Sequence, residues 1–183
     1  NYSEVNDWDL LLSKKLTGKI IFPKSPRIFL SIARKINHYN SIAKLKSQVM
    51  LFDDQNSLNW LINSDARVAI IPYTLCLKYL KLDSRLSIVF PDQGVPLMWH
   101  FILSKSINNN ESLTKWIDSL EEKSNVVKLA NEGWYLPYKK SDDGNKFKTM
   151  NLKILGPSQI CWENSWSFPL LTNLQKINLE KSW

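Results

Sequence analysis

The sequence predicts an α/β fold with parallel strands. Short apolar strand candidates alternate with helix candidates in the order βαβαβαβ up to about residue 93. Each strand candidate is a run of β-branched and aromatic residues, and the segment after it carries apolar residues at helical spacing. The composition is that of a globular chain, since 44% of the 183 residues are hydrophobic and 22% are charged. We therefore expect a parallel sheet with helices on both faces.

The first strand and helix are predicted between Gly18 and residue 36. Residues 19–23 (KIIFP) form a β-branched and aromatic run. Ser25 is the expected N-cap of the following helix, and Pro26 suits its first position. Apolar residues then recur at helical spacing: Ile28, Phe29, Ile32, Ala33 and Ile36.

Three further strands and two further helices complete the alternation. The strands are predicted over residues 49–52, 66–72 and 85–90, and the run at 66–72 (ARVAIIP) is the clearest of them. The helices are predicted over residues 57–63 and 73–82, from the spacing of their leucines and Tyr79.

The pattern changes after Gly94. One strand is predicted over residues 97–103, followed by helices over 111–122 and 125–131, with Asn110 as the cap of the first. In the last part of the chain, we expect an exposed loop over 139–148, an aromatic-rich segment over 161–166 that packs onto the body, and a helix over 170–179.

Charge and hydropathy exclude two classes of protein. The net charge of +7 raises a nucleic-acid hypothesis, but the Lys and Arg residues are scattered, with no run of five or more and no basic, aromatic-interleaved helix face. This favours a solvated basic surface without a nucleic-acid partner. The longest apolar runs, at residues 69–72 and 96–103, fall short of the roughly 20 residues that a membrane helix needs.

No catalytic or metal-binding pattern is present in the sequence. It has only two cysteines and two histidines, which are Cys76, Cys161, His38 and His100. Their spacing matches no metal site or nucleophile–base arrangement, and we expect free thiols. Asp53 and Asp54 are adjacent and are interpreted as a solvated turn. The sequence therefore predicts a protein that is not an enzyme and needs no cofactor or metal.

Several stretches resemble, in order, the polyamine-type substrate-binding proteins of ABC transporters, a branch of the type 2 periplasmic binding fold. The matching stretches are Trp8-Asp9-Leu10-Leu11, Leu16-Thr17-Gly18-Lys19-Ile20, Ser25-Pro26-Arg27, residues 66–72 as the central strand, Phe90-Pro91 with Gly94 and Trp99, and Gly133-Trp134-Tyr135-Leu136-Pro137. The resemblance covers about residues 7–138, and it is carried by the order and spacing of the stretches.

The resemblance implies two lobes that close by a hinge around a ligand. Residues 1–93 would be the second lobe, with a parallel-rich mixed sheet flanked by helices. Residues 94–138 would be a helical return segment of the first lobe, and 139–183 a loop and tail with a helix. The N-terminal part of the first lobe would be absent from this chain, as would the export signal. A monomer in the periplasm that meets ABC permease subunits is the expected context.

The expected ligand contacts follow the carboxyl ends of the predicted strands, where open parallel sheets bind ligands. They are Ser25, Arg27, Tyr73, Thr74 and Trp99. Polyamine binders of the family place carboxylates here, whereas this chain has Lys24 at the helix start and Phe101 where an acid is common. An anion at the helix N-terminus is the other interpretation. The ligand class, a polyamine or an anionic or other polar solute, stays open.

Function follows from the same resemblance. The leading expectation is the solute-binding component of an ABC importer, which captures a small polar solute between its lobes and delivers it to the permease. A ligand-sensing or regulatory domain of the same fold is an alternative. An enzyme on this fold is a further one, and its catalytic residues would have to lie outside this chain.

Overall fold

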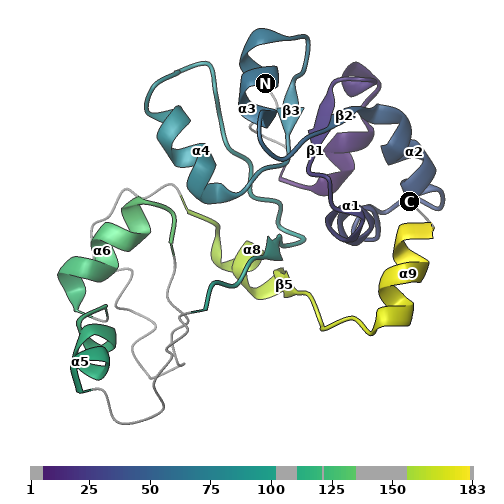
Figure 1. Ribbon diagram of the computed structural model, residues 1–183. Helices are drawn as coiled ribbons and strands as arrows, with labels where there is room; N and C mark the ends of the chain where they lie inside the picture. Colours follow the sequence, from purple (N-terminus) through teal and green to yellow (C-terminus); the bar gives the residue numbers. More distant parts are fainter. Residues whose placement is uncertain (1–5, 102–110, 121, 135–155, 182–183) are drawn as a thin grey trace. The chain divides into compact units, whose positions relative to one another are not determined.

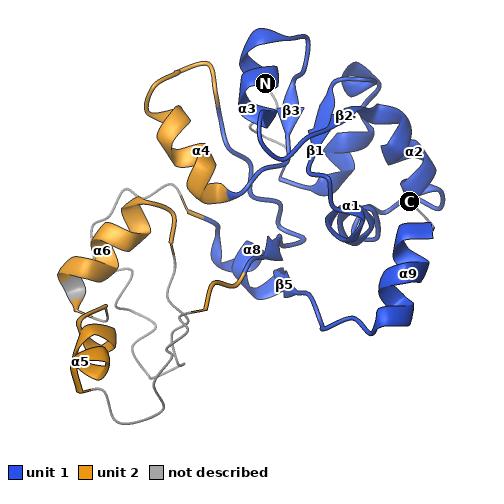
Figure 2. Ribbon diagram, viewed as in Figure 1, with its two compact units in different colours: residues 1–72, 87–98, 157–183 blue, residues 73–86, 99–156 orange. Residues whose placement is uncertain are grey.

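The computed structural model describes residues 6–101, 111–120, 122–134 and 156–181 (Figure 1). The predicted cap Asn110, the loop at 139–148 and the end of the strand at 97–103 lie outside the described residues. The chain divides into two compact units (Figure 2). Unit 1 contains residues 1–72, 87–98 and 157–183, and unit 2 contains residues 73–86 and 99–156.

Unit 1 contains a three-stranded parallel sheet, as the alternation of elements predicted. Its strands are β1 (Ile20–Phe22), β2 (Val49–Phe52) and β3 (Val68–Ala69), in the order β2-β1-β3. In the register, Ile20 pairs with Val49 on one side and with Val68 on the other. The connecting helices are α1 (Pro26–Ala33), α2 (Ser41–Gln48) and α3 (Ser57–Asn63). The fold is thus mixed α/β.

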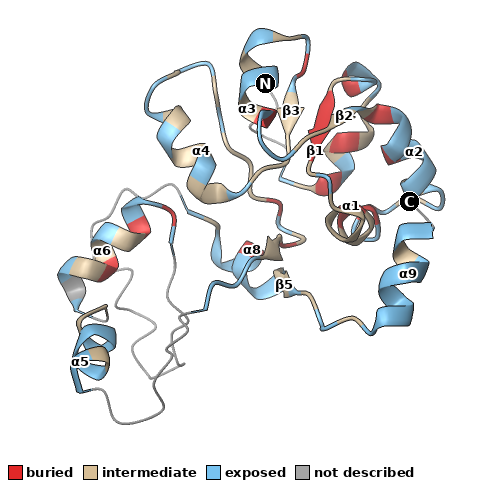
Figure 3. Cartoon of the chain, viewed as in Figure 1, coloured by how far each residue is buried: buried red, intermediate tan, exposed pale blue. Residues whose placement is uncertain are grey.

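The core of unit 1 lies between β1 and the helices that follow it (Figure 3). All three residues of β1 are fully buried, as expected for the central strand of a parallel sheet. The ring of Phe22 meets that of Phe29 edge to face, with centroids 5.1 Å apart, and Phe29 meets Phe52 at 5.9 Å. Edge-to-face rings add to the free energy gained by burial.

The start of the described chain belongs to the same core. The 3₁₀ helices η1 (Trp8–Leu12) and η2 (Lys14–Leu16) bury Trp8, Leu11 and Leu16. The indole Nε1 of Trp8 donates to the carbonyl of Gly94 at 2.9 Å, and its backbone N–H donates to the side chain of Gln93 at 2.6 Å. These bonds join residues 85 and 86 positions apart.

The rest of unit 1 comes from the second half of the chain. It consists of β4 (Pro96–Leu97), α8 (Gln159–Asn164), β5 (Trp166–Ser167) and α9 (Asn173–Lys181). Strands β4 and β5 form a second, two-stranded parallel sheet. The segment at 161–166, expected to pack onto the body, does so through Cys161, which is fully buried in α8.

The described part of unit 2 is helical. It contains α4 (Tyr73–Leu80), α5 (Glu111–Leu120) and α6 (Lys123–Asn131). Gly133 follows α6 with φ of 83°, and a Cβ there would lie 3.1 Å from atoms of both Tyr73 and Thr74. No helix in the described part of either unit is long and apolar enough to cross a membrane.

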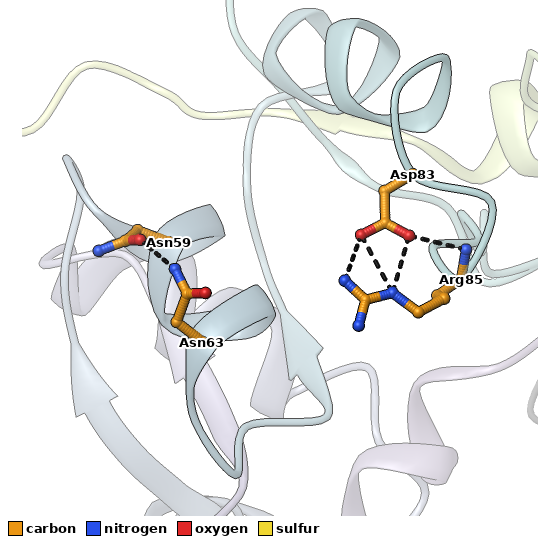
Figure 4. Close-up of polar contacts among 4 residues, drawn as sticks. All are labelled: Asn59, Asn63, Asp83 and Arg85. Atoms are coloured by element: carbon orange, nitrogen blue, oxygen red, sulfur yellow. Dashed lines mark hydrogen bonds and ion pairs between the residues drawn. The ribbon is translucent and has the colours of Figure 1, made fainter.

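The strand predicted over residues 85–90 is wrong. These residues form no strand, and Arg85 is exposed. Both the backbone N–H and the guanidinium of Arg85 donate to the carboxylate of Asp83, which closes a turn (Figure 4). Local bonds from an Asp side chain to the backbone compete with sheet pairing, and here the turn forms instead.

Two other strand predictions are too long. Of residues 66–72, only Val68–Ala69 pair as β3, although the N–H of Ile70 still donates to the carbonyl of Ile21 at 2.9 Å. Pro72 then offers no N–H to a neighbouring strand. Of the strand predicted at 97–103, the described residues pair only at Pro96–Leu97. The predicted helices at 57–63, 73–82, 111–122, 125–131 and 170–179 are confirmed within a few residues at their ends.

Candidate functional site

The strand order of unit 1 defines one preferred place for a ligand. The connection through α1 and α2 carries the chain from β1 to β2, and the connection through α3 carries it from β2 across to β3, on the other side of β1. The direction in which the chain adds successive strands therefore reverses, and the switch point lies between β1 and β3. In open parallel sheets, ligands bind beyond the carboxyl ends of the strands at such a switch point. The residues that follow Phe22 and Ala69 lie there.

The turn after β1 exposes the start of α1 at this place. Ser25 has extended backbone angles (φ −132°), and its hydroxyl accepts a hydrogen bond from the N–H of Ile28 at 3.3 Å. Pro26 follows at the first helical position, so both parts of the predicted helix start are confirmed. The first turn of α1 contains no acidic residue. The partial positive charge of the helix start is therefore not offset by a carboxylate of that turn.

Arg27 lies in the same turn and is held by the C-terminal part of the chain. Its Nη2 donates to the carbonyl of Pro169, and its guanidinium carbon lies 4.6 Å from the ring centre of Phe168. Both partners are neutral. Arg27 was predicted to counter a negative charge on a ligand, and in this structure its guanidinium contacts a carbonyl and an aromatic face instead.

The turn after β2 uses its two carboxylates locally. Asp53 accepts hydrogen bonds from the backbone N–H groups of Gln55 (2.9 Å) and Asn56 (3.3 Å) and from the indole of Trp60 (3.0 Å). These bonds, the backbone ones first, hold the pKa of Asp53 below its usual value. Asp54 accepts from the backbone N–H of Lys24 at 2.9 Å. The interpretation of this pair as a structural turn is confirmed.

The predicted site residues fall into two groups. Ser25 and Arg27 lie together in the first turn of α1, in unit 1. Tyr73 and Thr74 lie together in the first turn of α4, in unit 2, where both are close to Gly133. Trp99 belongs to unit 2 as well and is 49% exposed, so it is not a core tryptophan.

The neighbour of Trp99, His100, lies in a stretch, residues 98–101, that forms no strand. The imidazole of His100 lies edge-on to the ring of Trp134, with centroids 4.6 Å apart.

Sequence reasoning missed a shallow polar recess in unit 1. It is lined by Asn6, Asp7, Asp92, Gln93, Ile160 and Asn164. Asp7 caps η1 by accepting from the N–H of Leu10, and the side-chain amide of Asn164 donates to the carbonyl of Asp92 at 2.7 Å. The residues that line the recess come from three parts of the chain that are far apart in sequence, so no local sequence pattern predicts it. Its polar groups serve largely to tie these parts together.

The two thiols are poorly suited to nucleophilic chemistry. Cys76 and Cys161 form no disulfide, as expected. Burial raises the pKa of Cys76 to about 11 and also raises that of Cys161. Because the thiolate is the reactive form, both remain protonated near neutral pH. Within the described residues, no three His, Cys, Asp or Glu side chains gather where they could hold a metal ion.

Comparison with known proteins gives no relative. No protein-family model, curated protein or solved structure matches this chain.

Proposed function

We propose that this chain is part of the solute-binding protein of an ABC importer, acting in the periplasm. It captures a small polar solute and passes it to membrane permease subunits, with no chemistry of its own. The binding residues of unit 1 lie beyond the carboxyl ends of β1 and β3, and Ser25 and Arg27 are the central ones.

The observation that carries this proposal is the strand order β2-β1-β3. It puts a switch point directly beside the turn that begins α1, which is the geometry in which α/β sheets bind small ligands. The chain also passes between its two compact units after residues 72, 86, 98 and 156. Repeated crossing of this kind suits a protein whose two parts move against each other when a ligand binds.

The charges around the β1–α1 turn favour a solute with an anionic group. Lys24 and Arg27 flank Ser25, and the first turn of α1 has no acidic residue. The two carboxylates that follow β2, Asp53 and Asp54, already accept hydrogen bonds from backbone N–H groups, and the donor to Asp54 is Lys24 of this turn. An arginine fork pairs well with a carboxylate or phosphate.

A thermal-shift screen tests this proposal. The panel should contain spermidine, amino acids, dicarboxylates and inorganic phosphate. A ligand that binds only the folded chain stabilises it by about 2.7 kcal/mol at 100 times its dissociation constant. We expect an anionic member to raise the melting temperature and Arg27→Gln to remove that shift. Arg34→Gln, at the other end of α1, is the matched control and should retain it.

Two results would count against the proposal. Strong stabilisation by spermidine alone would show that the ligand class is wrong. A shift that persists unchanged in Arg27→Gln would show that the ligand binds away from the start of α1.

A further inference from the structure

The last described segment of the chain, residues 168–181, returns from β5 to the start of α1. It begins with an irregular stretch over residues 168–172 and ends in α9, which contacts α1 (Figure 1). We propose that residues 168–181 form a releasable strap, fastened to α1 by Arg27, whose release frees the guanidinium of Arg27.

The strap buries very little of its own surface. No residue of α9 is buried, and only Phe168, Leu171 and Leu179 in the whole strap are even half-buried. Leu170 is 99% exposed and Leu174 is 68% exposed. Burial of apolar surface is the main force that holds segments together, so a segment with this little burial opens more readily than the core.

Arg27 links the beginning of the strap to α1. It donates to the carbonyl of Pro169, and it lies over the ring of Phe168 at 4.6 Å. In the described part of the chain, the ion pairs are Asp83–Arg85 and Glu111–Lys115, and neither involves the strap. At the beginning of the strap, the attachment to α1 thus consists of one arginine and two neutral partners.

The helix at the end of the strap is capped by its own residues. The hydroxyl of Thr172 accepts from the N–H of Gln175 at 3.3 Å, and the side-chain oxygen of Gln175 accepts from the N–H of Thr172 at 2.9 Å. This reciprocal pair is a capping box, which satisfies two N–H groups at the helix start. Since the cap needs no group from the rest of unit 1, α9 keeps it when the strap opens.

Release has a consequence for ligand binding that rests on the proposed function. The Pro169 carbonyl and an anionic group of the solute would use the same guanidinium. A hydrogen bond to an ionised acceptor is stronger than one to a neutral carbonyl. The strap therefore competes with the solute for the Nη2 end of the Arg27 guanidinium until an anion displaces it.

Hydrogen exchange measured by mass spectrometry on the full chain tests the strap without any ligand. Peptides covering residues 168–181 should exchange at least about 100-fold faster than those covering β1, because local opening needs less free energy than global unfolding. Arg27→Gln should increase exchange of α9 severalfold while β1 stays protected, which also shows that the variant is folded. Phe168→Leu, which removes the ring but keeps an apolar side chain, should act in the same direction.

The matched control is Arg34→Gln, at the C-terminal end of the same helix. It should leave exchange of the strap unchanged. Protection of α9 equal to that of β1 would overturn the proposal, as would exchange in Arg27→Gln indistinguishable from the unmodified chain. Because no solute is present, this failure is separate from a failure of the proposed importer function.

Discussion

At the scale of single residues, charge-assisted hydrogen bonds between Arg85 and Asp83 stabilise a turn. The guanidinium Nη2 of Arg85 lies 2.6 Å from Oδ2 of Asp83, and Nε lies 2.9 Å from Oδ1. The hydrogen bonds from the Arg85 side chain, and then that from its backbone, lower the pKa of Asp83 from 3.8 to about 2. Because the folded pKa is depressed, the pair stabilises the turn above about pH 4 and this stabilisation is lost as the pH falls through 2.

We predict that Arg85→Gln raises the pKa of Asp83 back toward 3.8. An NMR titration of the Asp83 carboxyl carbon measures it directly. Asp53 is the internal control, because its pKa is lowered chiefly by backbone N–H groups of Gln55 and Asn56 that the substitution does not touch. An unchanged Asp83 titration in Arg85→Gln would contradict the bonding described here.

Two glycines, Gly94 and Gly18, have similar left-handed backbone angles but different surroundings, so substituting each of them separates backbone strain from steric clash. Gly94 has φ of 87°, and a Cβ there would collide with the backbone of Asn164. Gly18 has a similar φ of 67°, but nothing lies within 4 Å of the position of its Cβ. Left-handed backbone costs an L-residue roughly 1–2 kcal/mol at either site. Only at Gly94 is a steric clash added.

We therefore predict that Gly94→Ala lowers the free energy of unfolding by clearly more than the roughly 1–2 kcal/mol expected for Gly18→Ala. Urea unfolding of both variants measures the difference. Equal losses would mean that the approach of α8 to Gly94 is looser than the structure gives.

At the scale of elements, helix α1 depends on its N-cap residue, Ser25. The hydroxyl of Ser25 satisfies the N–H of Ile28. We predict that Ser25→Ala costs about 1 kcal/mol of stability, the usual value of an N-cap. Ser31→Ala, in the same helix, is the control, because the Ser31 hydroxyl only adds a second bond to the carbonyl of Ile28. Chemical denaturation should show the larger loss for Ser25→Ala, and the opposite order would contradict the assigned cap.

Elements whose conformation depends on neighbouring residues were predictable from sequence. Those that depend on residues outside the predicted segment were not. The start of α1 follows from Ser25 and Pro26, and the buried β1 follows from an unbroken apolar run. The apolar run at 85–90 looked equally clear, but the bonds between Asp83 and Arg85 hold its beginning in a turn. Helix α2 was not predicted, and its mixed sequence SIAKLKSQ explains why, since it buries only Leu45 and Gln48.

The candidate site shows the same division. Ser25 and Arg27 were found because a capped helix start after a strand is a local pattern. The contact of Arg27 with Phe168 and Pro169 joins residues more than 140 positions apart, which no periodicity reveals. The recess beside Asp92 and Asn164 escaped prediction for the same reason.

At the scale of the whole molecule, each compact unit is assembled from separate stretches of chain. Unit 1 takes residues from three stretches, and its second sheet pairs Pro96 with Trp166. The boundaries near residues 93 and 138 that the family resemblance implies stay predictions, as does the two-lobed arrangement. Which stretches combine into one unit depends on contacts between residues far apart in sequence. Local sequence patterns therefore do not predict it.

The central claim is that a small polar solute binds beyond the carboxyl ends of β1 and β3, at the start of α1. The most direct measurement is a map of backbone amide shifts by NMR while members of the solute panel are added to the full chain. We predict that the solute that stabilises the chain first shifts the amides of Lys24, Ser25, Arg27, Ile28 and residues 70–71. The amides of Phe168 and residues 170–172 should follow as the strap responds. Shifts confined to the recess around Asp92 and Asn164, or to unit 2 alone, would contradict the claim.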